Sequence, residues 1–113
     1  MIFEIGEKVH IVERRFFTDD LRRHFVGEVI QCTDYAFRIV GYTWAFDSFK
    51  GEFTRKPEKR VRVIFGGERH TINIIPRHVN IEEIKYVRDQ NKGLVATDGK
   101  GFSLEISEFT LMR

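Results

Sequence analysis

Two long apolar strands around a short polar turn dominate residues 24–46, HFVGEVIQCTDYAFRIVGYTWAF. With Thr33-Asp34 as the tip, Gly27 in the first strand falls opposite Val40, one place from Gly41 in the second. Glycine weakens the interior of a strand, whereas a sheet that curls into a small barrel needs such points to bend. Thr-Asp is a poor sequence for a tight turn, so we expect a longer loop or a β-bulge. The hairpin therefore predicts a strongly bent antiparallel sheet.

The apolar residues also favour strands. Val and Ile total 22 and Phe, Tyr and Trp total 15, whereas Leu, Ala and Met together total 9. β-branched and aromatic side chains suit a pleated, half-buried surface and lose rotamer freedom in a helix. A chain of 113 residues is close to the commonest domain size. We therefore expect an all-β protein with a single domain over residues 1–113.

Further strands are predicted on both sides of the hairpin. Alternating apolar residues predict a strand at residues 8–14, and residues 47–59 form a loop of 13 residues or a loop with ragged strand extensions. Residues 83–88 are expected to be a strand. Around the turn Asp98-Gly99-Lys100-Gly101, the sequences GLVAT and GFSLEI predict an additional C-terminal β-hairpin.

The clearest alternation flanks residues 66–69. RVRVIF at 60–65 and HTINII at 70–75 predict a hairpin with a four-residue connection. Pairing Phe65 with His70 places Arg62 directly across from Asn73 on the outer face, and places on the inner face Val61, Val63, Ile72 and Ile74.

No catalytic, metal-binding or cofactor motif is present in the sequence. Phosphate-binding glycine loops and nucleophile elbows are missing, the four histidines are scattered, and Cys32 is the single cysteine. We therefore expect no enzyme activity, no metal and no cofactor. No apolar run is long enough to cross a bilayer, and the N-terminus has no secretion signal, so a cytoplasmic protein without membrane association is the default expectation.

Charge is distributed unevenly although the net charge is only +2. Residues 50–70 hold seven basic and three acidic residues, whereas residues 82–108 hold four basic and six acidic residues. A local basic segment suits contacts to phosphate groups, and it is also common as a solvated loop.

Two motifs resemble the signatures of Sm-like RNA-binding proteins. The first runs Gly27-x-Val29, then Asp34-x-x-Phe37-Arg38, with arginine where the family has its base-recognising asparagine. The second is the segment Ile75-Pro-Arg77-His78-Val-Asn80-Ile81-x-x-Ile84, with His78 where the family has glycine. The opening Gly6-Glu-Lys-Val9 looks equally like the start of an SH3-like barrel. The resemblance implies a bent five-stranded barrel of Sm-like or SH3-like type that assembles through its edge strands.

The first functional hypothesis is a small nucleic-acid-binding module, with RNA as the expected ligand. Cations of the basic segment would contact phosphates, Asn73 would lie beside them, and Arg38, Arg77 and Asn80 enter through the resemblance. The candidate residues are Arg38, Arg55, Lys56, Lys59, Arg60, Arg62, Asn73, Arg77 and Asn80.

Tyr42, Trp44 and Phe46 recur with the period of a strand. Exposed, they would form a stacking platform for bases or an interface with another chain; buried, they would fill the core of a small barrel. A non-catalytic interaction or homo-oligomeric assembly subunit is the second hypothesis, favoured by the nearly neutral net charge. A third is ligand sensing of the PilZ kind, based on Arg55-Lys-Pro-Glu-Lys-Arg60, for which the second motif of that family is missing.

Overall fold

The computed structural model describes residues 3–14, 17, 22–65 and 70–106. Contacts divide the chain into two compact units, Met1–Arg77 and His78–Arg113. Both units are built from antiparallel strands, which confirms the all-β class. No described helix reaches the length and apolarity that a membrane span requires. The expectation of one domain over the whole chain stays a prediction.

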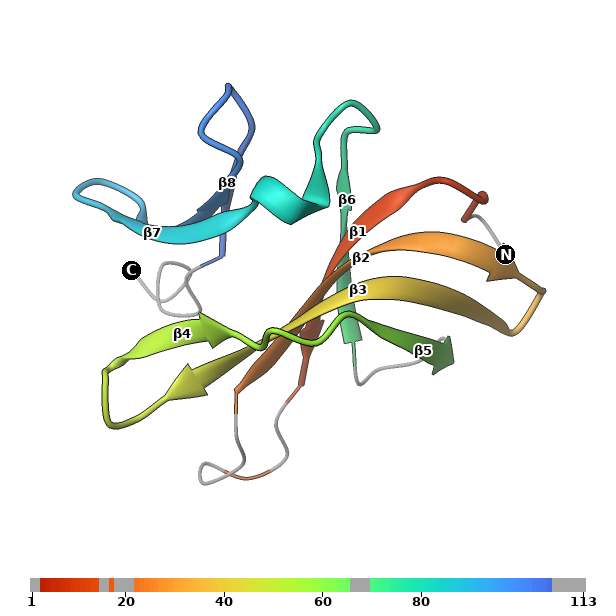
Figure 1. Ribbon diagram of the computed structural model, residues 1–113, viewed down its shortest axis with the longest axis horizontal. Helices are drawn as coiled ribbons and strands as arrows, with labels where there is room; N and C mark the ends of the chain where they lie inside the picture. The colour runs from red at the N-terminus through yellow and green to blue at the C-terminus, as the bar shows by residue number, and fades with distance from the viewer. Residues whose placement is uncertain (1–2, 15–16, 18–21, 66–69, 107–113) are drawn as a thin grey trace. The chain divides into compact units, whose positions relative to one another are not determined.

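The first unit is a six-stranded antiparallel sheet. Its central hairpin consists of β2 (Arg23–Cys32) and β3 (Ala36–Asp47), as predicted from residues 24–46. β1 (Lys8–Glu13) pairs with β2, and β6 (His70–Ile75) pairs with β1. β4 (Glu52–Arg55) and β5 (Arg60–Phe65) pair with different halves of β3. Figure 1 shows the hairpin as two long curved strands, with β4 near one end and β5 near the other.

A β-bulge shifts the register of the central hairpin. Val29 pairs with Ile39 and Gln31 pairs with Arg38, so Ile30 is the extra residue. The bulge confirms the expected irregular turn region and moves Gly27 opposite Gly41, one place from the predicted register. Longer connections and bulges relieve the strain that a tight Thr-Asp turn would impose.

The two glycines permit a close crossing of strands. A Cβ atom built on Gly27 would lie 2.7 Å from the carbonyl oxygen of Val40, and one built on Gly41 would lie closer still to that of Val26. Both obstacles are backbone atoms, which a rotamer change cannot move. The glycines are therefore a packing requirement of the bent hairpin.

One face of the sheet forms a continuous hydrophobic core. Its buried members are Val9, Ile11, Phe25, Val29, Phe37, Ile39 and Ile64. The opposite face of the same strands is also buried in part, through His10, Val26 and Trp44. Burial on both faces explains why the hairpin sequence is apolar at nearly every position.

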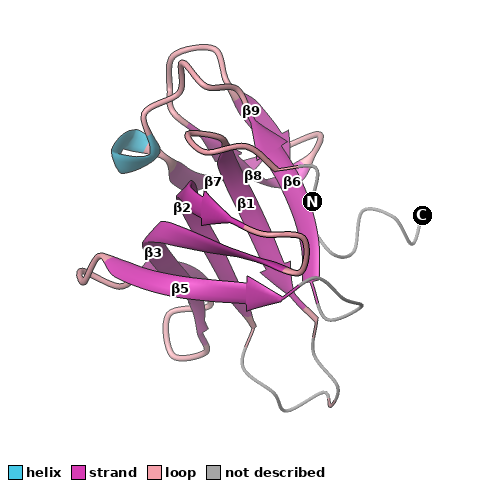
Figure 2. Ribbon diagram, turned by 90° about the vertical axis from the view of Figure 1, so that its right-hand side faces the viewer, coloured by secondary structure: helices cyan, strands magenta, loops and turns pink. Residues whose placement is uncertain are grey.

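The predicted pairing of residues 60–65 with 70–75 is wrong. β5 pairs with β3 and β6 pairs with β1, so Arg62 lies opposite Ile39, and Asn73 lies opposite His10. The predicted inner residues Val61, Val63 and Ile74 are exposed, while Ile64 is buried. Figure 2 shows β5 along one border of the sheet next to β3. Among the described residues no ladder joins β5 to β6, so the sheet is open there.

The second unit is a three-stranded antiparallel sheet preceded by one short 3₁₀ turn, η1 (Ile81–Glu83). Its strands are β7 (Lys85–Asp89), β8 (Gly93–Thr97) and β9 (Ser103–Glu105). β8 and β9 form the predicted C-terminal hairpin, and β7, predicted as a strand at 83–88, extends it. The turn is held by Asp98, which accepts backbone hydrogen bonds from Lys100 and Phe102.

Candidate nucleic-acid interface

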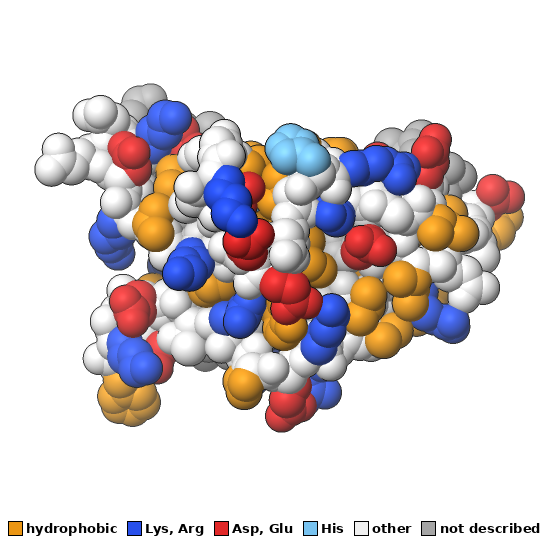
Figure 3. All heavy atoms as spheres, turned by 45° about the horizontal axis from the view of Figure 1, so that its top comes forward, with side chains coloured by type: hydrophobic (Ala, Val, Ile, Leu, Met, Phe, Trp, Pro, Cys, Tyr) orange, Lys and Arg blue, Asp and Glu red, His pale blue; other side chains and the backbone are white. Residues whose placement is uncertain are grey.

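Five of the candidate cations lie along one edge of β3. One edge of β3 is paired with β2. Along the other edge, β4 pairs with the C-terminal half of β3 and β5 with its N-terminal half, and the segment between β4 and β5 joins these two strands. We call this set the basic edge: Arg55, Lys56, Lys59, Arg60 and Arg62. Residues 47–59, expected as a loop or as a loop with ragged strand extensions, contain the short strand β4. Figure 3 shows basic and acidic side chains interspersed over the face in view.

Tyr42 lies at the centre of the basic edge and contacts two of its cations. The Arg55 guanidinium carbon is 4.4 Å from the centroid of the Tyr42 ring, and the Lys59 ammonium nitrogen is 5.8 Å from it. Both distances fall within the range of cation–π attraction. The contacts hold a half-buried aromatic ring, a planar guanidinium and an ammonium group in one cluster.

Arg60 and Arg62 continue the basic edge along β5. Arg60 forms an exposed ion pair with Glu58 at 2.7 Å. Arg62 donates a hydrogen bond to Thr43 Oγ1 at 3.3 Å, and its guanidinium carbon lies 5.5 Å from the centroid of the Phe25 ring. Alternation along the strand places both arginines on the core-facing side of β5 with Ile64.

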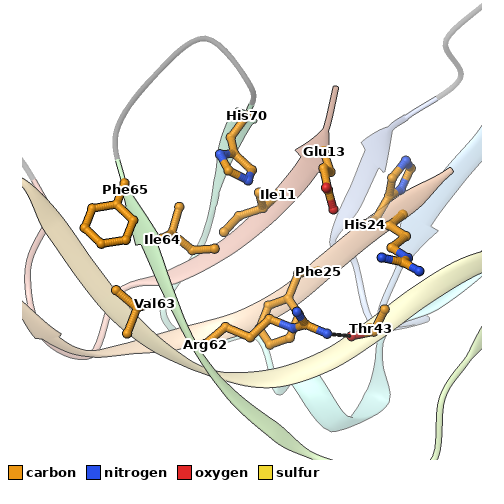
Figure 4. Close-up of a pocket in the computed structure, with 11 residues that line it drawn as sticks. Ile11, Glu13, His24, Phe25, Thr43, Arg62, Val63, Ile64, Phe65 and His70 are labelled. Atoms are coloured by element: carbon orange, nitrogen blue, oxygen red, sulfur yellow. Dashed lines mark hydrogen bonds between the residues drawn. The ribbon is translucent and has the colours of Figure 1, made fainter. Parts of the chain in front are cut away.

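A cavity of about 520 Å³ opens beside β5. Its lining includes apolar Ile11, Phe25 and Ile64 and polar Glu13, Arg62 and His70. Figure 4 shows Arg62 reaching from β5 across Phe25 to Thr43, with His70 and Glu13 on the opposite side of the cavity. An apolar floor with a few polar groups is typical of a binding site.

The structure separates the three aromatic candidates of β3. Trp44 is only 8% exposed and therefore belongs to the interior. Tyr42 and Phe46 are half-buried. The Phe46 ring packs edge-to-face against Phe53 at 5.5 Å, under the guanidinium of Arg22. The hypothesis of a continuous exposed stacking row is wrong for Trp44, because a small core needs a large side chain at this position.

Four other candidates are not part of the basic edge. Arg38 donates a hydrogen bond to Gln31 on the neighbouring strand, at 2.7 Å, and pairs with Val63 of β5 on the face of the sheet that also carries Tyr42. The Asn73 side chain is 3.3 Å from His10 Nδ1. Arg77 forms an ion pair with Glu4 at 3.2 Å.

Asn80 belongs to the second unit and caps η1. Its side-chain oxygen accepts a hydrogen bond from the backbone N–H of Glu82 at 3.0 Å. Asparagine is a common residue at this position because it satisfies a backbone donor of the first turn. Asn80 therefore has a local structural role that a resemblance between motifs does not reveal.

Two of the four histidines, which are scattered in the sequence, lie in the interior of the folded chain. His10 and His24 are completely or almost completely buried, and their rings meet edge-to-face at 5.1 Å. Burial lowers the pKa of His10 to about 4. Burial, followed by the charges of His10 and Arg22, lowers the pKa of His24 to about 3. No local motif signals this pair, because β1 and β2 bring the rings together only in the folded sheet.

In the part of the chain that the structure describes, no three His, Cys, Asp or Glu side chains are grouped to hold a metal ion. Comparisons with family models, curated proteins and solved structures give no match to this chain.

Proposed function

We propose that the chain is a nucleic-acid-binding module and that single-stranded RNA binds along the basic edge. The observation that carries the proposal is the cluster of Arg55 and Lys59 around Tyr42. Bases of single strands stack on aromatic rings and on guanidinium planes, and phosphates pair with nearby cations. The cluster offers both kinds of contact close together, with the ring from β3 and the cations from β4 and the segment that follows it.

The other cations lie along the same edge of β3, and those of β5 point to the face of the sheet opposite Tyr42. Lys56 and Arg60 are exposed on either side of Lys59 in the sequence, and Arg62 follows on β5. A single strand can follow such an edge because its backbone is flexible and its bases can turn away from their neighbours. The limited number of cations favours a short binding site of a few nucleotides.

The experiment is a fluorescence anisotropy titration of a labelled single-stranded RNA at low salt. Replacing Arg55 or Lys59 by Gln removes one cation and one contact to Tyr42, so each variant is expected to bind several-fold more weakly. Lys85→Gln, which removes the same charge from an exposed position on β7, is the matched control and is expected to bind like the unmodified chain.

Tyr42→Ala tests the stacking contribution separately. Loss of a stacked base contact is expected to weaken binding by about 1–3 kcal/mol. Tyr42→Phe keeps the ring and is expected to retain most of the affinity. The proposal fails if the unmodified chain does not bind at low salt, or if Lys85→Gln weakens binding as much as Arg55→Gln and Lys59→Gln.

A further inference from the structure

The cavity beside β5 has an apolar middle that crosses three strands of the first unit. Ile11 of β1 pairs with Phe25 of β2, and Phe25 pairs with Thr43 of β3. Because paired residues of neighbouring strands point to the same face, these three side chains form a row across the sheet. Ile11 and Phe25 are buried, and Ile64 of β5 adds a third buried apolar side chain to the lining. The row therefore gives the cavity an apolar floor with a hydroxyl group at one end.

Polar side chains stand on opposite sides of this floor. On one side, Arg62 reaches to Thr43 and donates a hydrogen bond to its hydroxyl group at 3.3 Å. On the other side lie Glu13 and His70, which pair with each other in the ladder between β1 and β6. Figure 4 shows the two sides with apolar side chains between them. A molecule in the cavity therefore meets a cation at one end and hydrogen-bonding groups at the other.

The charged side chains of the cavity are unevenly matched. Among the described residues that line it, two are arginines, Arg23 and Arg62, and one is a carboxylate, Glu13. Arg23 and Glu13 occupy neighbouring positions at the end of the ladder between β1 and β2, so their opposite charges offset each other. Arg62 then carries the excess positive charge. Its guanidinium has five N–H donors, and the hydrogen bond to Thr43 uses one nitrogen, so the group can also bind a carboxylate.

We infer that the cavity binds a small aromatic carboxylic acid that has a hydroxyl group at the far end of its rings. The carboxylate pairs with Arg62, the rings lie on the apolar floor beside Phe25, and the hydroxyl group donates a hydrogen bond to Glu13. A second carboxylate at the far end is disfavoured, because Glu13 carries the same charge. The cavity volume of about 520 Å³ lies within the range of small-molecule sites, about 300–1,000 Å³, and suits a ligand of two fused rings.

Calorimetric titration with 6-hydroxy-2-naphthoate tests the inference. Arg62 also belongs to the basic edge, so the titrations contain no nucleic acid and their outcome is independent of RNA binding. The unmodified chain is expected to bind this probe with a Kd of about 0.1–1 mM, because a small ligand in an open cavity binds weakly. The neutral 2-naphthol, which lacks the carboxylate, is expected to bind about tenfold more weakly.

Removal of single arginines locates the carboxylate. Arg62→Gln is expected to weaken binding of 6-hydroxy-2-naphthoate about tenfold and to leave binding of 2-naphthol unchanged. Arg38→Gln is the matched control: it also removes one cation and one side-chain hydrogen bond from the sheet, but on the face opposite the cavity floor, and binding is expected to be unchanged.

The far end of the ligand is tested with 2-naphthoate, which keeps the carboxylate and lacks the hydroxyl group. The unmodified chain is expected to bind it several-fold more weakly than 6-hydroxy-2-naphthoate. In Glu13→Ala the two probes are expected to bind equally, because the acceptor of the hydroxyl group is missing. A preference for the hydroxyl group that persists in Glu13→Ala would overturn the assigned orientation.

Methyl NMR of the unmodified chain locates the probe without any substitution. Signals of Ile11 and Ile64 are expected to shift with 6-hydroxy-2-naphthoate, whereas Ile84, a buried residue of the second unit, should not respond. Absence of saturable binding in the millimolar range, equal affinities for the hydroxynaphthoate and 2-naphthol, or unchanged signals of Ile11 and Ile64 would each overturn the inference. Equal effects of Arg62→Gln and Arg38→Gln would do the same.

Discussion

At the scale of single residues, the buried histidine pair determines how stability depends on pH. His10 and His24 have pKa values of about 4 and about 3 in the folded chain, because burial disfavours the charged imidazolium. In the unfolded chain both groups titrate near 6.5. Below that pH the unfolded chain therefore binds more protons, so acid shifts the equilibrium toward unfolding.

We expect the free energy of unfolding to be constant with respect to these groups above pH 6.5 and to fall as the pH decreases toward 4. The slope is up to about 1.4 kcal/mol per pH unit for each histidine. Urea unfolding at several pH values measures it. In His24→Phe the slope of the unfolding free energy against pH should be smaller by the contribution of one bound proton. Replacement of the exposed His78 by Gln should leave this slope unchanged. Equal slopes in all three chains would contradict this assignment.

At the scale of elements, the bent hairpin β2–β3 depends on its paired glycines. In Gly41→Ala the new Cβ collides with the backbone of Val26. Because three backbone atoms lie inside contact distance of this Cβ and cannot rotate away, the overpacking is expected to cost about 3 kcal/mol or more of unfolding free energy.

The comparison variant Gly51→Ala has open space around its Cβ but a backbone φ of +69°. Strain in the left-handed region alone is expected to cost about 1–2 kcal/mol. Thermal or urea unfolding of both variants should therefore show Gly41→Ala to be the less stable. The opposite order would contradict a close approach of strands at Gly41.

The sequence predicted the strands better than it predicted their partners. Alternation of apolar and polar residues located β1, β5 and β6, and two long apolar runs around a polar turn located β2 and β3. The same alternation in β5 does not indicate which face is inner, because Arg62 can pack its apolar stem against Phe25 and bind Thr43 with its head.

For the candidate site, the sequence indicated which cations lie close together and did not indicate which distant residues join them. The basic edge is nearly continuous in sequence, so its cations remain close after folding. Asn73 and Arg62 are also close in sequence, but their strands have different neighbours: β6, which carries Asn73, pairs with β1, and β5, which carries Arg62, pairs with β3. Only the order of the strands separates them, and no short segment encodes that order.

At the scale of the whole molecule, the small net charge of +2 limits how RNA can bind. Contacts are expected only where cations gather, since the surface as a whole attracts a polyanion weakly. Binding through three or four phosphates of a single strand gives a slope of about −2 to −3 for log affinity against log salt. A tightly bound, salt-insensitive complex is therefore not expected.

The salt dependence of RNA binding is the decisive measurement for binding along the basic edge. We expect the affinity of the unmodified chain to fall by roughly 15- to 60-fold between 50 and 200 mM salt, following that slope. Arg55→Gln and Lys59→Gln should each reduce the slope by roughly 0.7 to 1, and Lys85→Gln should leave it unchanged. A slope close to zero, or one that is the same in all four chains, would contradict binding along the basic edge.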